Sequence, residues 1–274
     1  MIIVKLRGGL GNQMFQYAFG KACAVKTGEP LLLDLTWYTN SKRKFILKEM
    51  KVSLRCLIKN PRILKVIKFL KKPTIIQDKG FFEEKNLNFS GNTILDGYWE
   101  SHNYFEQIVP TINKEFQLKK SSRKFTELLN RIKRDSIAVH VRRGDYLIPH
   151  GKFVNGLDYY NKGVETIIQN KTLETPEITI FSDDPEWCRK ELKFLGGRPT
   201  ETFEEKLASD AEELILMSHY GHNVISNSTF SWWSAFLNKN PDKMVVMPEN
   251  WFTDKKINAN HLSSIYVPGW IVVK

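Results

Sequence analysis

The sequence is poor in cysteine and contains no long apolar run. Its 274 residues include three cysteines, Cys23, Cys56 and Cys188. They are widely spaced and odd in number, which fits no disulfide framework, zinc site or redox motif and favours a reducing compartment. No segment approaches the roughly 20 apolar residues of a membrane span. The chain opens on an apolar strand and not on a signal peptide. We therefore expect a cytoplasmic protein.

Short fingerprints of common nucleotide and nucleic-acid sites are also missing. There is no P-loop and no spaced Gly-x-Gly-x-x-Gly motif, which counts against ATPases and dinucleotide-dependent enzymes. There is no zinc finger, RNP-type motif or recognisable helix-turn-helix, so nucleic acid is not expected as a partner. The sequence has neither solenoid repeats nor low-complexity tracts.

What the chain does have is a globular composition with an uneven charge. It is 42% hydrophobic and 26% charged, as in ordinary globular proteins. Residues 1–134 carry 26 basic and 11 acidic side chains, a net charge of +15, whereas residues 135–274 carry 15 and 19, a net charge of −4. Such asymmetry indicates two halves with different partners. We place a domain boundary near residue 133.

Strands and helices alternate in both halves. The first half predicts strands at 2–6, 31–34 and 93–98 and helices at 12–27 and 61–72. After a basic helix at 121–134, the second half predicts strands at 136–142, 177–182, 223–226 and 243–247, with helices at 157–170, 185–195, 204–219 and 229–239. Repeated β-α order predicts parallel sheets with crossover helices, an α/β fold.

Polar side chains follow three of the predicted strands of the second half. The apolar strand that contains His140 runs into Arg142 and Arg143, and arginine can hold phosphate oxygens bidentately. The alternative is a strand that ends in a solvated basic turn. The strand that ends at Ser182 is followed by Asp183 and Asp184.

The two aspartates leave three interpretations. Asp184 could cap a helix that begins at Pro185. One carboxylate could accept both of the adjacent N–H groups of guanine. The pair could instead bind a divalent metal, but hard cations usually require more oxygen ligands than this segment offers. We favour recognition of the base.

The third strand end carries the segment Ser226–Thr229 in front of a predicted helix. Free N–H groups, the helix dipole and hydroxyls make such a helix start an anion site, although an ordinary N-cap needs only one of these residues. We expect Trp232 and Trp233 to serve packing more than sugar stacking. Arginines, carboxylates and an anion site fit a nucleotide diphosphate in the crevice of an open α/β sheet.

Two segments of the first half could also bind ligands. The loop after the first strand has three glycines, and Asn12 and Gln13 follow it near a helix start. The segment Asp96–His102 places aromatic and polar groups at a strand end. It suits a carbohydrate, and packing explains it equally well.

Together these segments resemble the bacterial alpha-1,2-fucosyltransferases of glycosyltransferase family 11. The matching pieces run in family order over nearly the whole chain and are Gly8–Ala18, Gly97–Ser101, His140–Tyr146, Asp158–Tyr160, Phe181–Pro185 and Ser226–Trp233. The resemblance implies an α/β fold of GT-B type, with two Rossmann-like domains facing across a cleft. Residues 1–133 would form the acceptor-side domain and residues 134–274 the domain that binds GDP-fucose.

The resemblance also implies a reaction. This is inverting, metal-independent transfer of L-fucose from the donor substrate GDP-fucose, without a cofactor. The acceptor would be the 2-hydroxyl of a terminal galactose on a surface or lipopolysaccharide-type glycan. The implied donor-binding residues are Asn12, Gln13, His140, Arg142, Asp183, Asp184, Asn227, Ser228 and Thr229. Arg142 would contact the diphosphate, and Tyr98, Trp99 and Glu100 are the candidates for acceptor binding.

Three questions stay open at this level. The base that takes the acceptor proton could be Asp145, unless Asp145 forms a structural ion pair with Arg143; Glu100 and His102 are weaker candidates. The basic helix at 61–72 could lie on an anionic membrane at the inner face of the cytoplasmic membrane, or pack as an ordinary amphipathic helix. A GDP-sugar transferase of another linkage, or a non-catalytic glycan- or nucleic-acid-binding protein, is the alternative function.

Overall fold

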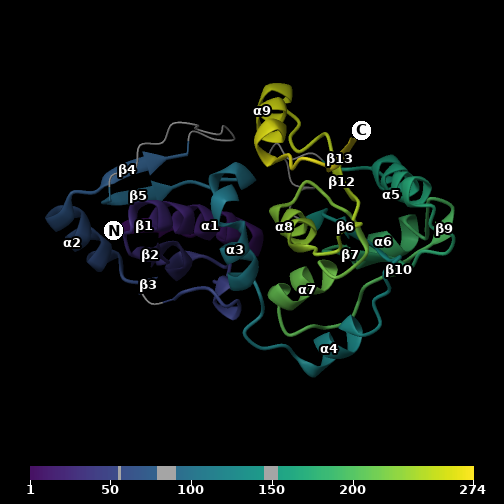
Figure 1. Cartoon of the computed structure of the whole chain (residues 1–274), viewed down its shortest axis with the longest axis horizontal. Helices are drawn as coiled ribbons and strands as arrows, with labels where there is room; N and C mark the ends of the chain where they lie inside the picture. Colours follow the sequence, from purple (N-terminus) through teal and green to yellow (C-terminus); the bar gives the residue numbers. More distant parts are fainter. Residues whose placement is uncertain (55–56, 79–90, 145–153) are drawn as a thin grey trace. The chain divides into compact units, whose positions relative to one another are not determined.

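The chain folds into two compact units (Figure 1). The computed structural model describes residues 1–54, 57–78, 91–144 and 154–274. The first unit comprises residues 1–119 and 263–265, and the second comprises residues 120–262 and 266–274. This division lies before the boundary expected near residue 133, because α4 (Arg123–Leu129) packs on α7 (Asp210–Met217). Ser122, the N-cap of α4, donates its backbone N–H and its hydroxyl to the carboxylate of Glu212.

The sheet of the first unit has five parallel strands in the order β3-β2-β1-β5-β4. Its strands are β1 (Ile2–Lys5), β2 (Leu31–Asp34), β3 (Leu57–Ile58), β4 (Thr74–Gln77) and β5 (Thr93–Asp96). The helices are α1 (Leu10–Thr27), α2 (Pro61–Lys71) and α3 (Val109–Glu115), with 3₁₀ turns at Thr36–Asn40, Leu47–Glu49, His102–Tyr104 and Glu106–Ile108. The strand order reverses between β1 and β5, where open α/β sheets bind ligands.

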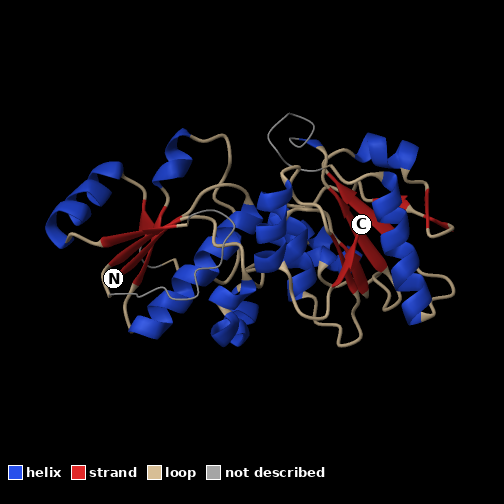
Figure 2. Ribbon diagram, turned by 90° about the horizontal axis from the view of Figure 1, so that it is seen from above, coloured by secondary structure: helices blue, strands red, loops and turns tan. Residues whose placement is uncertain are grey.

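Helices cover both faces of this sheet (Figure 2). On the α1 side, a Cβ at Gly20 would lie 3.0 Å from Val4, so this helical glycine permits close packing on β1. On the other side, Ile3 of β1 packs with Leu64 of α2. Because neighbouring residues of a strand point to opposite faces, α1 and α2 lie on opposite sides of the sheet.

The sheet of the second unit has six parallel strands in the order β10-β7-β6-β11-β12-β13. These are β6 (Ile137–Val141), β7 (Ile178–Ser182), β10 (Glu201–Thr202), β11 (His222–Val224), β12 (Val245–Pro248) and β13 (Ile271–Val273). The remaining elements are α5 (Leu157–Lys171), α6 (Pro185–Glu191), α8 (Thr229–Leu237), α9 (Lys255–Ile265) and the hairpin of β8 (Phe194–Leu195) with β9 (Arg198–Pro199). Starting from β6, the strands follow in the order β6-β7-β10 on one side and β11-β12-β13 on the other, as in a dinucleotide-binding Rossmann sheet. The direction in which strands are added therefore reverses between β6 and β11.

Both sheets confirm the predicted α/β fold with two Rossmann-like units. Trp232 and Trp233 are fully buried, and the ring of Trp232 stacks on that of Phe236 with centroids 4.8 Å apart. The expectation that this tryptophan pair serves packing is therefore confirmed.

Several predicted helices are shorter than expected. Residues 204–209, for example, lie outside α7, because its N-cap is Ser209, which accepts a hydrogen bond from the Glu212 N–H.

Candidate functional site

The reversal point of the second sheet brings together two segments that are far apart in sequence. His140, in β6, and Ser226, just after β11, lie on neighbouring strands, with Nδ1 and Oγ 2.7 Å apart. His140 is 5% exposed. Burial and, to a smaller extent, the positive charge of Arg142 together lower the pKa of its imidazole to about 3. The ring is therefore neutral near pH 7 and can act there only as an uncharged hydrogen-bonding group.

Beside His140, the arginines pair with the aspartates from the end of β7. Arg142 Nη1 lies 3.1 Å from Asp183 Oδ2, and the backbone N–H of Arg143 donates to Asp183 Oδ1 at 2.9 Å. A Cβ at Gly144 would lie 2.6 Å from Asp183 Oδ2, so any other residue at this turn would displace the Asp183 carboxylate. Asp183 thus fixes both the Arg142 side chain and the turn that follows it.

Asp184 has a different set of partners. Its Oδ1 accepts a hydrogen bond from the Trp187 N–H at 3.2 Å, as the N-cap of α6. Its Oδ2 accepts from Arg143 Nε at 3.2 Å, and the Arg143 guanidinium stacks on the Trp187 ring, 3.8 Å from its centroid. Asp184 therefore serves as the predicted cap. Asp183 caps no helix and is exposed as a residue, whereas Asp184 is only partly exposed, so Asp183 is the better placed of the two to meet a ligand.

The segment Ser226–Thr229 forms the start of α8. Asn227 is buried and accepts a hydrogen bond from Asn155 Nδ2 at 3.0 Å, while its own amide donates to the Trp251 carbonyl at 3.0 Å. Ser228 caps α8 by accepting from the Phe230 N–H at 3.3 Å. Asn227 therefore positions this segment, and the N-terminal N–H groups of α8 are its anion-binding feature.

Sequence reasoning missed an acidic group next to Asp183. Glu213, in the first turn of α7, is partly buried. Burial and, to a smaller extent, the negative charges of Asp210 and Asp183 together raise the pKa of its carboxyl to about 7. The acidic run Asp210–Glu213 at a helix start was the available signal, but only the fold shows that it lies near the end of β7.

The raised pKa of Glu213 makes stability depend on pH. Its folded-state pKa lies above the ordinary 4.5, so its stabilising contribution is complete below about pH 4.5 and is lost as the pH rises through about 7. Glu213→Gln should therefore match wild type near pH 4.5 and exceed its free energy of unfolding by roughly 2–3 kcal/mol above about pH 8. Urea unfolding across this range measures the difference. Glu186→Gln, an exposed site in α6, is the control; an equal pH-dependent gain there would contradict the assignment.

In the first unit, Gln13 is fully buried and its amide is occupied by main-chain groups. Nε2 donates to the carbonyls of Gly8 and Lys44, at 3.2 and 2.9 Å. Oε1 accepts from the N–H groups of Ile46 and Leu47, both at 3.0 Å. Gln13 therefore holds residues 44–47 against α1. Asn12 is partly exposed at the start of the same helix.

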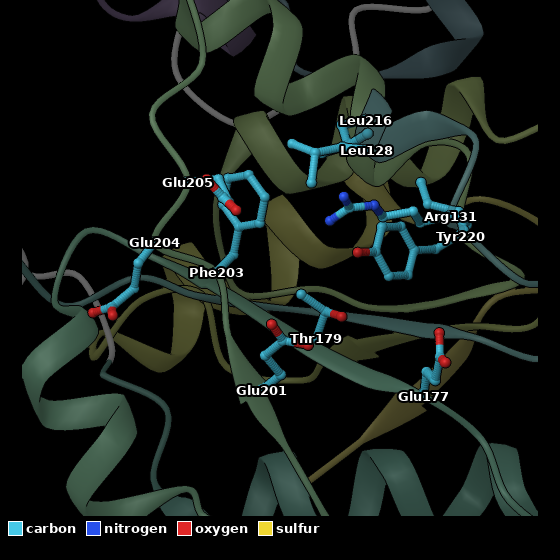
Figure 3. Close-up of a pocket in the computed structure, with 11 residues that line it drawn as sticks. Leu128, Arg131, Glu177, Thr179, Glu201, Phe203, Glu204, Glu205, Leu216 and Tyr220 are labelled. Atoms are coloured by element: carbon cyan, nitrogen blue, oxygen red, sulfur yellow. The ribbon is translucent and has the colours of Figure 1, made fainter. Parts of the chain in front are cut away.

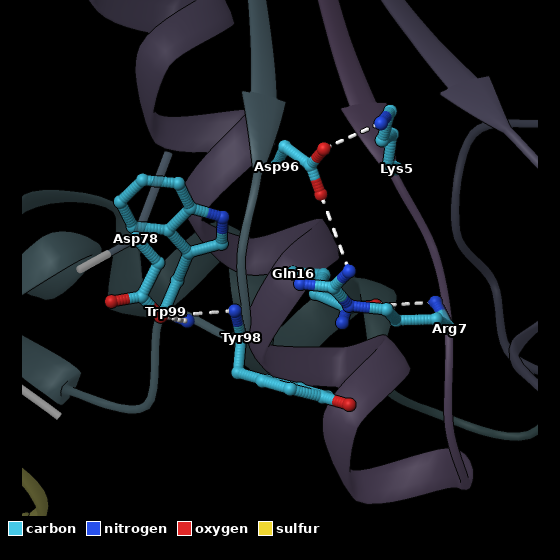
Figure 4. Close-up of polar contacts among 7 residues, drawn as sticks. All are labelled: Lys5, Arg7, Gln16, Asp78, Asp96, Tyr98 and Trp99. Carbon is cyan, nitrogen blue, oxygen red and sulfur yellow. Dashed lines mark hydrogen bonds and ion pairs between the residues drawn. The ribbon is translucent and has the colours of Figure 1, made fainter. Parts of the chain in front are cut away.

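A charged cluster follows β1 and β5, at the reversal point of the first sheet (Figure 4). Asp96 pairs with Lys5 at 2.5 Å and with Arg7 at 3.3 Å. The Arg7 guanidinium lies over the ring of Tyr98, 4.7 Å from its centroid, and its backbone N–H donates to Gln16 Oε1 at 2.9 Å. Two cations share one carboxylate, so the cluster carries a surplus positive charge.

The three candidates for acceptor binding lie in different surroundings. Tyr98 is 37% exposed, and one face of its ring is in cation–π contact with the Arg7 guanidinium. Trp99 is 1% exposed and packs on Phe19, with ring centroids 4.4 Å apart, so it belongs to the core of the first unit. Asp78 accepts hydrogen bonds from the N–H groups of Tyr98 and Trp99 (Figure 4). Glu100 is partly exposed. Asp145 lies outside the described residues.

A pocket of about 240 Å³ lies at the carboxyl ends of β1 and β2 in the first unit. Trp37 lines it and is 42% exposed, whereas Asp34, also in the lining, is 2% exposed. Thr36, Thr39 and Asn40 add hydroxyl and amide groups. An aromatic face beside a few polar groups suits a sugar ring. Residues 36–60 have no regular apolar pattern, so this pocket was not predicted.

A second pocket, of about 150 Å³, lies near β10 and β7 in the second unit. Figure 3 shows the Arg131 guanidinium between Phe203 and Tyr220, with Glu177, Glu201, Glu204 and Glu205 around the pocket. Three of these glutamates pair with surface cations: Glu177 with Lys133, Glu204 with Arg189, and Glu205 with Lys124. No predicted site residue lines this pocket.

Within the described ranges, no group of three or more histidine, cysteine, aspartate or glutamate side chains is arranged to hold a metal ion. In the same part of the chain, no helix has the length and apolar character needed to cross a bilayer.

Comparison with known proteins identifies the family. The model of glycosyl transferase family 11 matches residues 1–274. The chain belongs to this family. Its predicted identification from sequence motifs is therefore confirmed, and the protein is a glycosyltransferase of family 11.

Its relatives include enzymes from bacteria and animals. An alpha-1,2-colitosyltransferase of Escherichia coli is 26% identical, with coverage of 94% of this chain and 95% of the relative. The O-antigen biosynthesis glycosyltransferase WbnK of Escherichia coli is 27% identical, with coverage of 97% and 98%. The galactoside 2-alpha-L-fucosyltransferase Sec1 of Mus musculus is 26% identical over 86% of this chain and 64% of the relative.

Solved structures support the fold. The crystal structure of NodZ alpha-1,6-fucosyltransferase soaked with GDP-fucose matches with a TM-score of 0.50 and 16% identity, covering 86% of this chain and 91% of that one. The structure of Arabidopsis thaliana FUT1 mutant R284K in complex with GDP matches with a TM-score of 0.50 and 12% identity, covering 93% and 72%. At this identity the likeness concerns the fold alone, which is of GT-B type.

Proposed function

We propose that this family 11 enzyme transfers L-fucose from GDP-fucose to the 2-hydroxyl of a terminal galactose, with inversion and without a metal ion. One observation carries the proposal: Arg142, held by Asp183, lies at the reversal point of the second sheet, where His140 meets Ser226. This is where a Rossmann sheet binds a nucleotide diphosphate. The alpha-1,2 linkage follows the name of one bacterial relative, the alpha-1,2-colitosyltransferase. The glycan would be a surface or lipopolysaccharide-type glycan, and the enzyme would work in the cytoplasm.

The proposed mechanism centres on the leaving group. The bond between fucose and GDP breaks early, and negative charge grows on the departing β-phosphate. The Arg142 guanidinium and the N–H groups at the start of α8 stabilise this charge, because preorganised donors act most strongly where charge develops. The acceptor hydroxyl attacks the anomeric carbon from the face opposite GDP, which inverts the configuration. Asp145 stays the nominal base for the acceptor proton.

Recognition of guanosine would use the neighbouring residues. The Asp183 carboxylate already accepts from Arg142 and from the Arg143 N–H, but a carboxylate has about four acceptor sites, so it can also accept both adjacent N–H groups of guanine. The neutral imidazole of His140 adds an uncharged hydrogen-bonding group. Ser228 and Thr229 would flank the phosphates at the start of α8. We leave Gln13 and Asn227 out of the direct contacts, because their amides bond to protein groups.

The test is product analysis with the full chain. The purified protein is incubated with GDP-fucose and a panel of galactosides, with EDTA or with added magnesium or manganese, and products are analysed by NMR. We expect an α1,2-linked fucose on galactose at equal rates in all three conditions. Another linkage would replace this proposal with a different fucosyltransferase, and activity that needs metal would overturn the metal-independent mechanism. Because one relative is a colitosyltransferase, a nucleotide-activated colitose belongs in the donor panel.

The pocket beside Trp37 supplies a test of the acceptor side. Trp37→Ala removes an exposed aromatic face worth about 1–2 kcal/mol of apolar contact with a sugar ring. We expect the KM for the acceptor to rise roughly tenfold, with the KM for GDP-fucose and kcat little changed. Phe194→Ala, which removes an exposed ring of β8 in the second unit, should alter neither KM. Equal acceptor KM values for wild type and Trp37→Ala would exclude this pocket as an acceptor subsite.

A further inference from the structure

Helix α2 packs on the first sheet with only part of its apolar surface. Leu64 is its one buried residue among those described, and Ile67 joins it against Ile3, Ile58 and Ile94. The other four apolar side chains of the helix are exposed: Ile63 by 51%, Val66 by 55%, Phe69 by 79% and Leu70 by 68%. Single exposed apolar residues are ordinary, but a contiguous group of them usually marks an interaction surface.

The exposed side of α2 is divided between apolar and basic residues. Ile63, Val66 and Leu70 follow the spacing i, i+3, i+7 and form one stripe along the helix. Lys65 and Lys68 form a second stripe. At 100° per residue, Phe69 falls between these two stripes, and it is the most exposed of the apolar side chains.

The neighbouring edge strand extends the apolar surface. Ile75 of β4 is 49% exposed and pairs in register with Ile94, so both point to the same face of the sheet. Ile94 packs against Leu64, which identifies this face as the one that α2 covers. β4 is an edge strand of the first sheet (Figure 1). The α2 surface is therefore formed by Ile63, Val66, Phe69, Leu70 and Ile75 together with Arg62, Lys65 and Lys68.

The charge of the α2 surface is entirely positive. The sequence has no acidic residue between Glu49 and Asp78. Arg62, Lys65 and Lys68 form no ion pair with another described residue. Bulky apolar side chains next to flexible cations, without a carboxylate, complement a surface that presents phosphates above hydrocarbon.

We propose that the α2 surface docks the enzyme on an anionic lipid bilayer. The apolar stripe enters the boundary between head groups and acyl chains, and the lysine stripe meets the lipid phosphates. The sequence left open whether this helix packs on its domain or lies on lipid. In the structure one side of the helix packs on the sheet and leaves the α2 surface exposed. This proposal goes beyond the transfer reaction and does not depend on the identity of the sugar. It would keep the enzyme at the surface where lipid-linked glycans are found.

Vesicle flotation of the full chain tests the docking. Wild type is mixed with vesicles of phosphatidylcholine alone or of phosphatidylcholine with about one third phosphatidylglycerol, at low and high salt. We expect flotation only with the anionic vesicles, and weaker flotation at high salt because surface charges are then screened. The double variants Lys65→Glu/Lys68→Glu and Phe69→Ser/Leu70→Ser should each lower the bound fraction at least tenfold.

Matched controls separate a docking site from net charge. Lys255→Glu/Lys256→Glu changes the net charge by the same amount at the exposed start of α9, and Phe194→Ser removes another exposed ring. Both should float like wild type, and all variants should keep the thermal midpoint and GDP affinity of wild type. Three results would overturn the proposal: no flotation of wild type, equal losses in the α2 and α9 variants, or a dimer in light scattering that Phe69→Ser/Leu70→Ser dissolves. The last result would make a second copy the occupant.

Discussion

Replacing Arg142 with alanine is expected to lower kcat by about 10²–10³, the loss seen when one preorganised donor to a developing negative charge is removed. Arg142 is the guanidinium that Asp183 holds at the reversal point of the second sheet. The guanidinium stabilises the negative charge of the leaving phosphate most strongly in the transition state. The fold-decrease in kcat should therefore be larger than the fold-decrease in affinity for GDP. Arg142→Lys should recover only part of the rate, because an ammonium cannot form the planar fork.

Steady-state kinetics with GDP-fucose, together with calorimetric titration of GDP, separates these effects. Asp183→Asn is the companion variant, since it weakens both the contact to guanine and the support of Arg142; it should reduce GDP affinity as well as kcat. Arg189→Ala, which removes an arginine that pairs with Glu204 on the surface of the second unit, is the matched control and should leave both constants unchanged. Near wild-type kcat in Arg142→Ala would refute the proposed role of this arginine.

Gly221→Ala is expected to prevent stable folding of the second unit. A Cβ at Gly221 would lie 1.8 Å from the carbonyl oxygen of Arg134 and 3.0 Å from that of Ser136. Both of these oxygens belong to the backbone and cannot turn aside as a side chain can. The start of β11 would therefore have to move away from β6, and the pairing between His222 and Ile137 would be lost. A strand displacement of this kind should cost more than about 4 kcal/mol, which is exceptional for a single substitution.

Thermal unfolding of purified protein checks this expectation. A loss of this size should lower the midpoint by roughly 10 °C or more for a chain of this length, or leave no soluble protein. Gly156→Ala is the matched control: Gly156 precedes α5 in the second unit, with a φ of −84° and nothing within 4 Å of an added Cβ. Its midpoint should stay within a few degrees of wild type. A stable Gly221→Ala variant with intact GDP binding would show that β6 and β11 can separate without loss of the site.

Long, strongly patterned elements were predictable from local sequence. The buried strand before Arg142, the strand before Asp183 and the helix after Ser228 all appear in the structure as β6, β7 and α8. Apolar residues in an unbroken run and a capping residue at a helix start leave a signal within a few neighbouring positions. Elements without such a signal were not predicted, including the short strands β4, β10 and β13 and the helix α9.

The individual roles of polar residues were harder to predict. Asp183 and Asp184 are adjacent in sequence, yet one holds Arg142 and the other caps α6. Gln13 and Asn227 look like ligand groups in the sequence, but their amides satisfy buried main-chain and side-chain groups. A buried amide must find partners wherever the fold supplies them, and those partners lie tens of residues away.

The sequence by itself determined the α/β class, the family and the three polar strand ends, because each of these features depends on patterns of residues that are close together along the chain. Only the tertiary structure decided that His140 and Ser226, 86 residues apart, meet on neighbouring strands, since strand order depends on how the sheet packs as a whole. It likewise decided which side of α2 is exposed. A helix can pack only one stripe of side chains against a sheet. Because the sequence of α2 has more than one apolar stripe, the sequence alone could not say which of them packs.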